Sequence, residues 1–234
     1  MKVLYIYPHP DDESFGPAHA MHKQSRDGHD VHLLTLTRGG VTRQRHKYGY
    51  SVSEMGNVRF KEMQAVAETL KLKGMSVLDF PDSGLKDLDP RQLENAVEDE
   101  IHRVCPQVVV TYPVHGISGF YDHLVTHAVV KRVFVALKEM VPVLQRLAFI
   151  SITESQAKNG YFPLHSTPNQ EIACIETVDK EDIEAAHRAL DCYVTFQETI
   201  EKTGIKSYFN REARFQLFLE SFHPPLQSLF HQLK

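Results

Sequence analysis

The sequence predicts an α/β fold, a Rossmann-like three-layer sandwich around a mostly parallel central sheet. Three observations support this prediction. Short apolar runs alternate with longer stretches of helical periodicity, which is the pattern of repeated βαβ units. Most of the apolar runs are bounded by Pro, Gly or Asp. No internal repeat, low-complexity tract or linker interrupts the 234 residues, so we expect a single domain over 1–234.

The expected strands are runs rich in Val, Leu, Ile or Tyr, at residues 2–8, 31–37, 76–80, 107–112, 146–152 and 171–177. Helices are expected between or after them, near residues 15–28, 57–72, 90–104, 122–140 and 180–197. The late aromatic segment 215–219 is expected in the core. In open α/β sheets, ligands bind outside the carboxyl ends of the strands. We therefore expect functional residues in the loops 8–14, 38–56, 81–88 and 113–122.

Composition argues against several classes of protein. The formal net charge of −4 gives no basic field for nucleic acid. The three cysteines show no CxxC spacing and are typical of reduced thiols in a cytosolic protein. The apolar run 3–7 stops at Pro8 and is too short for a signal peptide or a membrane span. These features predict a cytoplasmic protein without nucleic-acid or membrane partners, and they leave open whether it forms a homo-oligomer.

The loop after the first expected strand has the sequence PHPDDESFG over residues 8–16. A dinucleotide site would need Gly-x-Gly-x-x-Gly there, and adjacent acids would repel phosphate. One imidazole beside carboxylates suits a divalent metal instead, because both are zinc ligands. Pro10 disfavours helix at His9, so the ligands can be presented before the helix begins. The alternative is acidic capping of a helix start, but His9 and two successive acids exceed what capping requires.

A second group of candidates follows the fourth expected strand. Gly116 and Gly119 lead to Asp122, which we expect to be the N-cap of a helix that starts at His123. His123 would then lie in the first turn and face the pocket. His127 stands four residues later on the same helix face, so spacing alone does not choose between the two histidines.

These segments resemble the LmbE-like, or PIG-L, family of N-acetylglucosamine deacetylases. The motifs that carry the resemblance follow one another along the chain: HPDDE at 9–13, TRGG at 37–40, MGNVRxxE at 55–62, DSGL at 82–85, Asp122-His123 in place of His-x-Asp-His, and AHR at 186–188. The resemblance implies an amidohydrolase that removes acetyl from an N-acetylglucosamine-type conjugate. A small anionic conjugate, such as N-acetylglucosaminyl malate, would suit the basic loop after the second strand.

The resemblance also implies roles for individual residues. His9, Asp12 and His123 would bind Zn2+, and Fe2+ can replace zinc in such a site of two histidines and one aspartate. Asp11 and Asp122 would be the catalytic carboxylates, with Asp11 the general base toward a zinc-activated water.

Phe120 departs from the family pattern. It stands where the family usually has the first histidine of His-x-Asp-His, and phenylalanine can neither assist an oxyanion nor protonate the leaving amine. His115, His187, Tyr121 or a zinc-bound water could take over that role. The alternatives are therefore a zinc hydrolase of another amide or ester, or a catalytically silent metal- or sugar-binding member of the family.

Two arginines are candidate substrate contacts. Arg43 belongs to a basic, tyrosine-containing loop that could bind an anionic substrate group or could simply be solvated. Arg59 lies in a helical stripe with Met63 and Val66 that should face the sheet. A buried arginine needs an anionic ligand or a carboxylate partner. For the structural alternative, the expected partners are Glu62, Asp82 and Glu13.

His187 is the third candidate substrate contact. Its place in the late Ala-His motif favours the pocket, whereas its position on an apolar helix face is typical of a satisfied core histidine. Together with the arginines, it predicts a small-molecule amino-sugar substrate that carries negative charge if the Arg43 loop takes part.

Overall fold

The computed structural model describes residues 1–233 and contains one seven-stranded sheet in the order β3-β2-β1-β4-β5-β7-β6. The strands are β1 (Lys2–Tyr7), β2 (Asp30–Thr37), β3 (Gly74–Phe80), β4 (Val108–Thr111), β5 (Arg146–Ser151), β6 (Ile172–Thr177) and β7 (Glu212–Leu217). Strands β1 to β5 pair in parallel, and β7 runs antiparallel to both β5 and β6. The predicted α/β class and mostly parallel sheet are confirmed.

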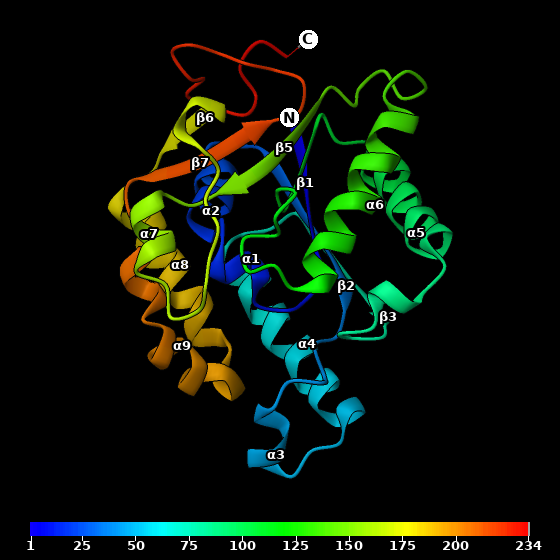
Figure 1. Ribbon diagram of the computed structural model, residues 1–234, viewed down its shortest axis with the longest axis vertical. Coiled ribbons are helices and arrows are strands. Elements are labelled where there is room, and N and C mark those ends of the chain that lie inside the picture. The colour runs from blue at the N-terminus through cyan, green and yellow to red at the C-terminus, as the bar shows by residue number, and fades with distance from the viewer. Residues whose placement is uncertain (234) are drawn as a thin grey trace.

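The α-helices are α1 (Asp12–Phe15), α2 (Ala18–Arg26), α3 (Gln44–Tyr48), α4 (Val52–Thr69), α5 (Pro90–Val104), α6 (Tyr121–Leu137), α7 (Glu154–Lys158), α8 (Lys180–Cys192) and α9 (Gln197–Thr203). Short 3-10 turns lie at Leu85–Asp87, Asn169–Glu171, Val194–Phe196 and Ile205–Tyr208. Figure 1 shows α5 and α6 on one side of the sheet and α8 and α9 on the other. Among residues 1–233, no helix is long and apolar enough to cross a membrane.

The three layers follow from the alternation of side chains along β1. Val3, Tyr5 and Tyr7 join one hydrophobic cluster with residues of α2, α4 and α8. Leu4 and Ile6 point to the opposite face and join a second cluster with residues of α5 and α6. Successive residues of a strand face opposite sides, so a strand that is apolar at every position needs helices on both faces.

The strand order changes direction between β1 and β4. The chain proceeds outward from β1 to β2 and β3, and then returns to place β4 on the other side of β1. Ligand sites of open α/β sheets lie at such a switch point. It brings the loop after β1, which contains His9, beside the loop after β4, which leads to His123.

Several predicted elements need correction. The predicted helix over 15–28 is broken at Gly16-Pro17, because proline cannot donate the backbone hydrogen bond of a continuous helix. Helix α4 begins at Val52, where Ser51 and Glu54 form a capping box within the region expected to be loop. The predicted helix over 180–197 is α8, a short 3-10 turn and the start of α9.

Two further corrections concern the end of the chain and α6. The segment 215–219 is only partly core: Phe215 and Leu217 are buried in β7, which alternates inward and outward, whereas Leu219 is 84% exposed. Strand β7 was not predicted. The N-cap of α6 is Phe120, and Asp122 lies within the first turn instead of capping it.

Candidate metal centre and active site

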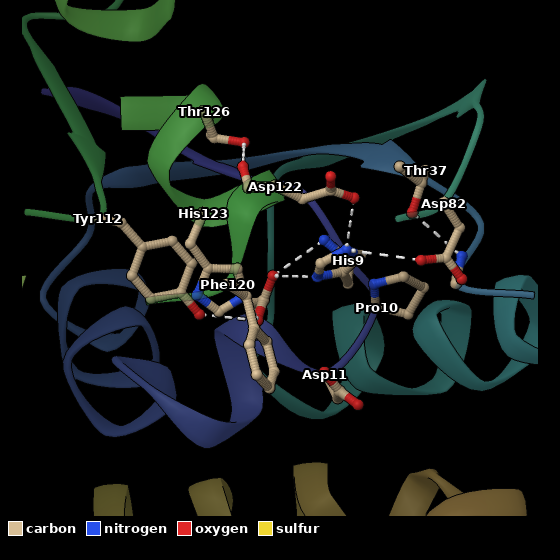
Figure 2. A network of polar contacts seen from close by, with 12 residues as sticks. His9, Pro10, Asp11, Thr37, Asp82, Tyr112, Phe120, Asp122, His123 and Thr126 are labelled. Carbon is tan, nitrogen blue, oxygen red and sulfur yellow. Dashed lines mark hydrogen bonds and ion pairs between the residues drawn. The ribbon is translucent and has the colours of Figure 1, made fainter. Parts of the chain in front are cut away.

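His9, Asp12 and His123 converge at the switch point. One donor atom from each lies within 4.8 Å of the other two. His9 Nδ1 is 3.5 Å from Asp12 Oδ2, and His123 Nε2 is 3.4 Å from Asp12 Oδ1. The fold therefore gathers two imidazoles and one carboxylate, a donor set that suits zinc. Figure 2 shows His9 and His123 approaching this point from separate segments of the chain.

The outer nitrogen of each imidazole is already occupied. His9 Nε2 lies 3.0 Å from Asp122 Oδ2, and His123 Nδ1 lies 2.9 Å from the carbonyl oxygen of Gly116. Metal-binding histidines almost always use their second nitrogen in this way, which fixes the ring and its tautomer. His9 Nδ1 and His123 Nε2 are thereby left facing Asp12, so the surrounding contacts also fit a metal ion.

Asp122 is held by the turn after β3. Its carboxylate accepts hydrogen bonds from the backbone N–H groups of Ser83 (2.8 Å) and Leu85 (3.2 Å) in addition to its contact with His9. These contacts explain why it does not cap α6. Its carboxylate supports His9 and does not line the cavity described below.

Asp12 is buried and ionised. Its Oδ1 accepts a 2.7 Å hydrogen bond from the Tyr112 hydroxyl, and its Oδ2 accepts a 2.9 Å hydrogen bond from the backbone N–H of His9. Burial alone would raise the pKa of Asp12, but the His123 and His9 imidazoles outweigh it and lower the pKa below the ordinary range. The carboxylate is therefore available as an anionic ligand.

Asp11 lies beside this cluster with its backbone in the left-handed region, at φ 84°. Its N–H donates a 2.8 Å hydrogen bond to the Tyr193 hydroxyl, which donates in turn to Glu13 Oε1. Its Oδ2 is 2.6 Å from the Arg59 guanidinium. Burial raises the pKa of Asp11 to about 6, and Arg59 opposes this rise. A carboxyl group with a pKa near neutrality can act as a general base.

Arg59 is a buried member of the apolar stripe of α4, as predicted, but the expected carboxylate partners are wrong. Its partner is Asp11, and it also donates to the carbonyl oxygen of Pro10 at 3.0 Å. Its guanidinium lies 4.6 Å from the centre of the Phe196 ring. Glu62 is instead bonded to the backbone N–H and hydroxyl of Thr195.

A cavity of about 610 Å³ opens beside the cluster. Of the predicted site residues, those that line it are His9, Asp11, Asp12, Arg43, Arg59 and His123. His187 does not: its Nε2 lies 3.0 Å from the carbonyl oxygen of Lys206, and its ring packs against Phe209. Its role as a substrate contact stays a prediction.

The two histidines that the spacing left open lie in different surroundings, and the assignment of His123 as the ligand stays a prediction. His123 joins the donor cluster, whereas His127 Nδ1 lies 2.9 Å from the carbonyl oxygen of Tyr112 and its ring packs against Phe149. Phe120 lines the cavity and is 55% exposed. Neither His115 nor Tyr121, two of the suggested replacements for the missing histidine, lines the cavity.

Some site residues were not predicted. Tyr112 and Tyr193 hold Asp12 and Asp11, but nothing near them in the sequence marks them as functional, because only the fold brings them to the loop after β1. Asp82 could have been found from the DSGL turn. Its Oδ1 lies 3.6 Å from His9 Nε2, and its Oδ2 accepts a 2.7 Å hydrogen bond from the N–H of Val41.

Comparison with known proteins agrees with this geometry. A family model described as PIG-L, GlcNAc-PI de-N-acetylase, matches residues 4–134, which is more than half of the chain and includes every residue of the donor cluster. The chain belongs to the PIG-L family. Members of this family that match it include deacetylases of N-acetylglucosamine-type compounds.

Two PIG-L relatives illustrate the similarity. The chain is 30% identical over 155 residues to a probable N-acetyl-alpha-D-glucosaminyl L-malate deacetylase 2 of Bacillus cereus, a match that covers 65% of this chain and 70% of that protein. It is also 30% identical over 147 residues to mycothiol S-conjugate amidase of Streptomyces coelicolor. That match covers 55% of this chain and 50% of the relative, so the chain spans about half the length of that protein.

A solved structure extends the likeness in fold to nearly the whole chain. A deacetylase of the teicoplanin biosynthesis pathway superposes with a TM-score of 0.73 at 15% identity, and the match covers 93% of this chain and 97% of that one. At this identity the likeness shows the fold alone.

Proposed function

We propose that this PIG-L family protein is a zinc-dependent hydrolase that removes the N-acetyl group from an N-acetylglucosamine-type conjugate. The convergence of His9, Asp12 and His123 on one cavity, with Asp11 beside them, carries the proposal. His9 Nδ1, the Asp12 carboxylate and His123 Nε2 would hold the metal. When bound, zinc supplies a Lewis acid and lowers the pKa of a coordinated water to about 7. Fe2+ fits the same three donors.

Asp11 would receive the proton of the attacking water. Its pKa of about 6 keeps it ionised at neutral pH yet basic enough to accept a proton. Arg59 holds its Oδ2, and Tyr193 holds its backbone N–H, so the carboxylate has little freedom to rotate away. Because Phe120 cannot donate a proton, we propose that Asp11 also returns the proton to the leaving amine.

The test is release of acetate from methyl 2-acetamido-2-deoxyglucoside and related N-acetylglucosamine conjugates by the zinc-loaded protein. Asp11→Asn should reduce acetate release by at least about 100-fold, the lower range for a general base, while zinc content is unchanged. The exposed Asp79→Asn is the matched control and should keep full activity. Wild-type turnover by Asp11→Asn would contradict the proposed role of Asp11.

Because Phe120 stands where the family usually has a histidine, the same experiment also tests a second candidate function. A family member that binds zinc but releases no acetate from any conjugate of the panel would be a metal- or sugar-binding protein without this activity. Hydrolysis of another amide or an ester, with the same requirement for Asp11, would instead indicate a different substrate for the same centre.

A further inference from the structure

The cavity extends well beyond the metal-ligand cluster. Its volume of about 610 Å³ lies within the range that encloses most of a drug-sized ligand. An acetyl group, with two carbons, occupies a small part of such a space. Most of the remaining wall comes from the end of β5, the segment 160–164, the α9 region and the turn that leads to β7.

This part of the wall, which we call the apolar chamber, is built largely from aliphatic and aromatic side chains. Its apolar lining residues are Phe15, Ile150, Ile152, Tyr161, Phe162, Leu164, Phe196, Ile205 and Phe209. Figure 1 shows that α7 and α9, which contribute Gln156, Thr199 and Thr203 to the cavity wall, lie on the β6–β7 side of the molecule, away from α5 and α6. Most of the chamber's apolar side chains therefore come from the part of the chain that follows β5.

Several polar groups at the chamber are already used within the protein, whereas Nδ1 of the buried His19 has no hydrogen-bond partner among residues 1–233. Gln156 Nε2 donates a 2.7 Å hydrogen bond to the carbonyl oxygen of Tyr208, whose hydroxyl donates at 2.6 Å to that of Asn159. Arg214 pairs with Glu212 at 2.8 Å. With these partners taken, the chamber has few free groups to replace the hydrogen bonds that a sugar hydroxyl would lose with water.

The His19 imidazole, which lines the chamber, is uncharged. His19 is buried against Phe209, and its Nε2 lies 3.4 Å from the carbonyl oxygen of Glu212. Burial lowers the pKa of His19 to about 4, so the imidazole is neutral at physiological pH. A negatively charged group in the chamber would therefore gain no attraction from this ring.

Aromatic side chains continue to the mouth of the cavity. Tyr161 and Phe162 are 59% and 46% exposed, and they pack on each other with ring centres 4.8 Å apart. Phe120, which also lines the cavity, is largely exposed as well. Exposed apolar groups that adjoin a binding cavity are typical of ligand contact surfaces.

We propose that the apolar chamber binds an alkyl or aryl aglycone of the amino-sugar substrate. This inference rests on the proposed deacetylation, in which the acyl group is only acetyl and the amine product carries the bulk of the substrate. The aglycone leaves water for a surface that offers apolar contact and little competition from free polar groups. It differs from the anionic aglycone that the Arg43 loop predicts.

The test compares two glycosides of 2-acetamido-2-deoxyglucose that differ only in the aglycone, methyl and octyl, below the critical micelle concentration. Each buried methylene contributes about 0.8 kcal/mol, or roughly fourfold, so partial burial of the octyl chain should raise kcat/KM at least about tenfold. The binding constants of both glycosides are measured as well by titration calorimetry, so that the result does not depend on turnover.

Variants locate the effect. Phe162→Ala should lower the ratio of kcat/KM for the octyl glycoside to that for the methyl glycoside several-fold, because Phe162 lines the chamber and is not one of the candidate metal ligands. Phe209→Ala should do the same if it folds. Leu219→Ala, an equally apolar and 84% exposed position outside the cavity, is the control and should keep the full preference.

The outcomes separate this inference from the proposed function. Acetate release at equal kcat/KM and equal affinity for the two glycosides would leave the deacetylase standing and overturn the apolar aglycone. A preference for N-octanoylglucosamine over N-acetylglucosamine, without an aglycone preference, would also overturn it by placing the apolar group on the acyl side. Tighter binding of the octyl glycoside without acetate release would support the chamber and count against the proposed reaction.

Discussion

Asp122 Oδ2 lies 3.0 Å from Nε2 of His9, while Nδ1 of the same imidazole faces Asp12. The carboxylate is itself fixed by the N–H groups of Ser83 and Leu85. Three segments that are far apart in sequence thus hold the His9 ring with Nδ1 toward Asp12 (Figure 2). From this contact we propose that Asp122 positions His9 at the candidate metal centre, and this proposal leads to a first prediction.

Asp122→Asn should weaken zinc binding about 10- to 100-fold, the usual effect of losing an outer partner of a ligating histidine. The amide keeps the shape of the side chain but removes the negative charge that polarises His9. Competition with a chromophoric chelator measures the zinc affinity. Asp79→Asn, at an exposed position, is the control. An unchanged zinc affinity in Asp122→Asn would show that the contact with His9 is not needed for the metal.

Arg59 should set the acid limb of the pH–activity profile. Its charge lowers the pKa of Asp11 against the effect of burial. Removing that charge in Arg59→Gln raises the pKa, so a higher pH is needed to ionise the base. The acid limb of kcat/KM should therefore move to higher pH, and Arg59→Lys should restore part of the shift. A profile that falls in height without moving would indicate that Arg59 acts only through packing.

Tyr193→Phe should combine a stability loss with a loss of turnover. The Tyr193 hydroxyl bridges the Asp11 N–H and the buried Glu13 carboxylate, so its removal should cost about 1–3 kcal/mol. Asp11 also loses a contact that holds its left-handed backbone, and kcat should fall several-fold. Chemical denaturation and steady-state kinetics measure the two effects.

Tyr5→Phe is the matched control for that variant. The Tyr5 hydroxyl donates a hydrogen bond to Gln24 in the same buried layer but does not line the cavity. Its loss should cost similar stability and leave kcat unchanged. If both variants lowered kcat equally, the bridge from Tyr193 to Asp11 would have no special role.

His19 should make stability depend on pH. Its pKa is about 4 in the folded chain, below its ordinary value near 6.5, so the unfolded chain binds the proton more tightly. The folded state therefore loses stability as pH falls from about 6.5 to 4, by about 3 kcal/mol from this group.

The measurement is urea denaturation of wild type and His19→Gln at pH 7 and pH 4. Glutamine does not titrate, so the difference in unfolding free energy between the variant and wild type should shift in favour of the variant at pH 4. The comparison at each pH cancels the contributions of other buried groups. A difference that is the same at both pH values would contradict a neutral, buried His19.

The sequence predicted the parts of the fold that repeat a simple pattern. Strand β1 is apolar and buried from Val3 to Tyr7 and was expected, whereas β7 has only Ala213, Phe215 and Leu217 facing inward and was not. Helix α5 matches its predicted bounds because Asp89 and Pro90 mark its start in a regular way. Helix α4 starts before its predicted position, since the Ser51–Glu54 capping box lay in a segment interpreted as loop.

The candidate site was also predicted only in part from the sequence. His9, Asp11 and Asp12 are adjacent in sequence, so their motif was visible. The partners that hold them could not be predicted, because Tyr193 is 180 residues or more from the loop it supports. Asp122 was expected to be the N-cap of α6 because of its position before the helix. Its carboxylate instead accepts hydrogen bonds from N–H groups of the turn after β3, and no local sequence pattern predicts that contact.

Zinc content of the variants at the two competing histidines is the most direct measurement, since the metal centre underlies the proposed reaction. His123→Ala should lose bound zinc at equal protein concentration after dialysis against a weak chelator. His127→Ala, one helical turn away and bonded to the Tyr112 carbonyl, should keep the same zinc content as wild type, which we expect to be one zinc per chain. Retention of zinc by His123→Ala, or its loss only in His127→Ala, would contradict the centre formed by His9, Asp12 and His123.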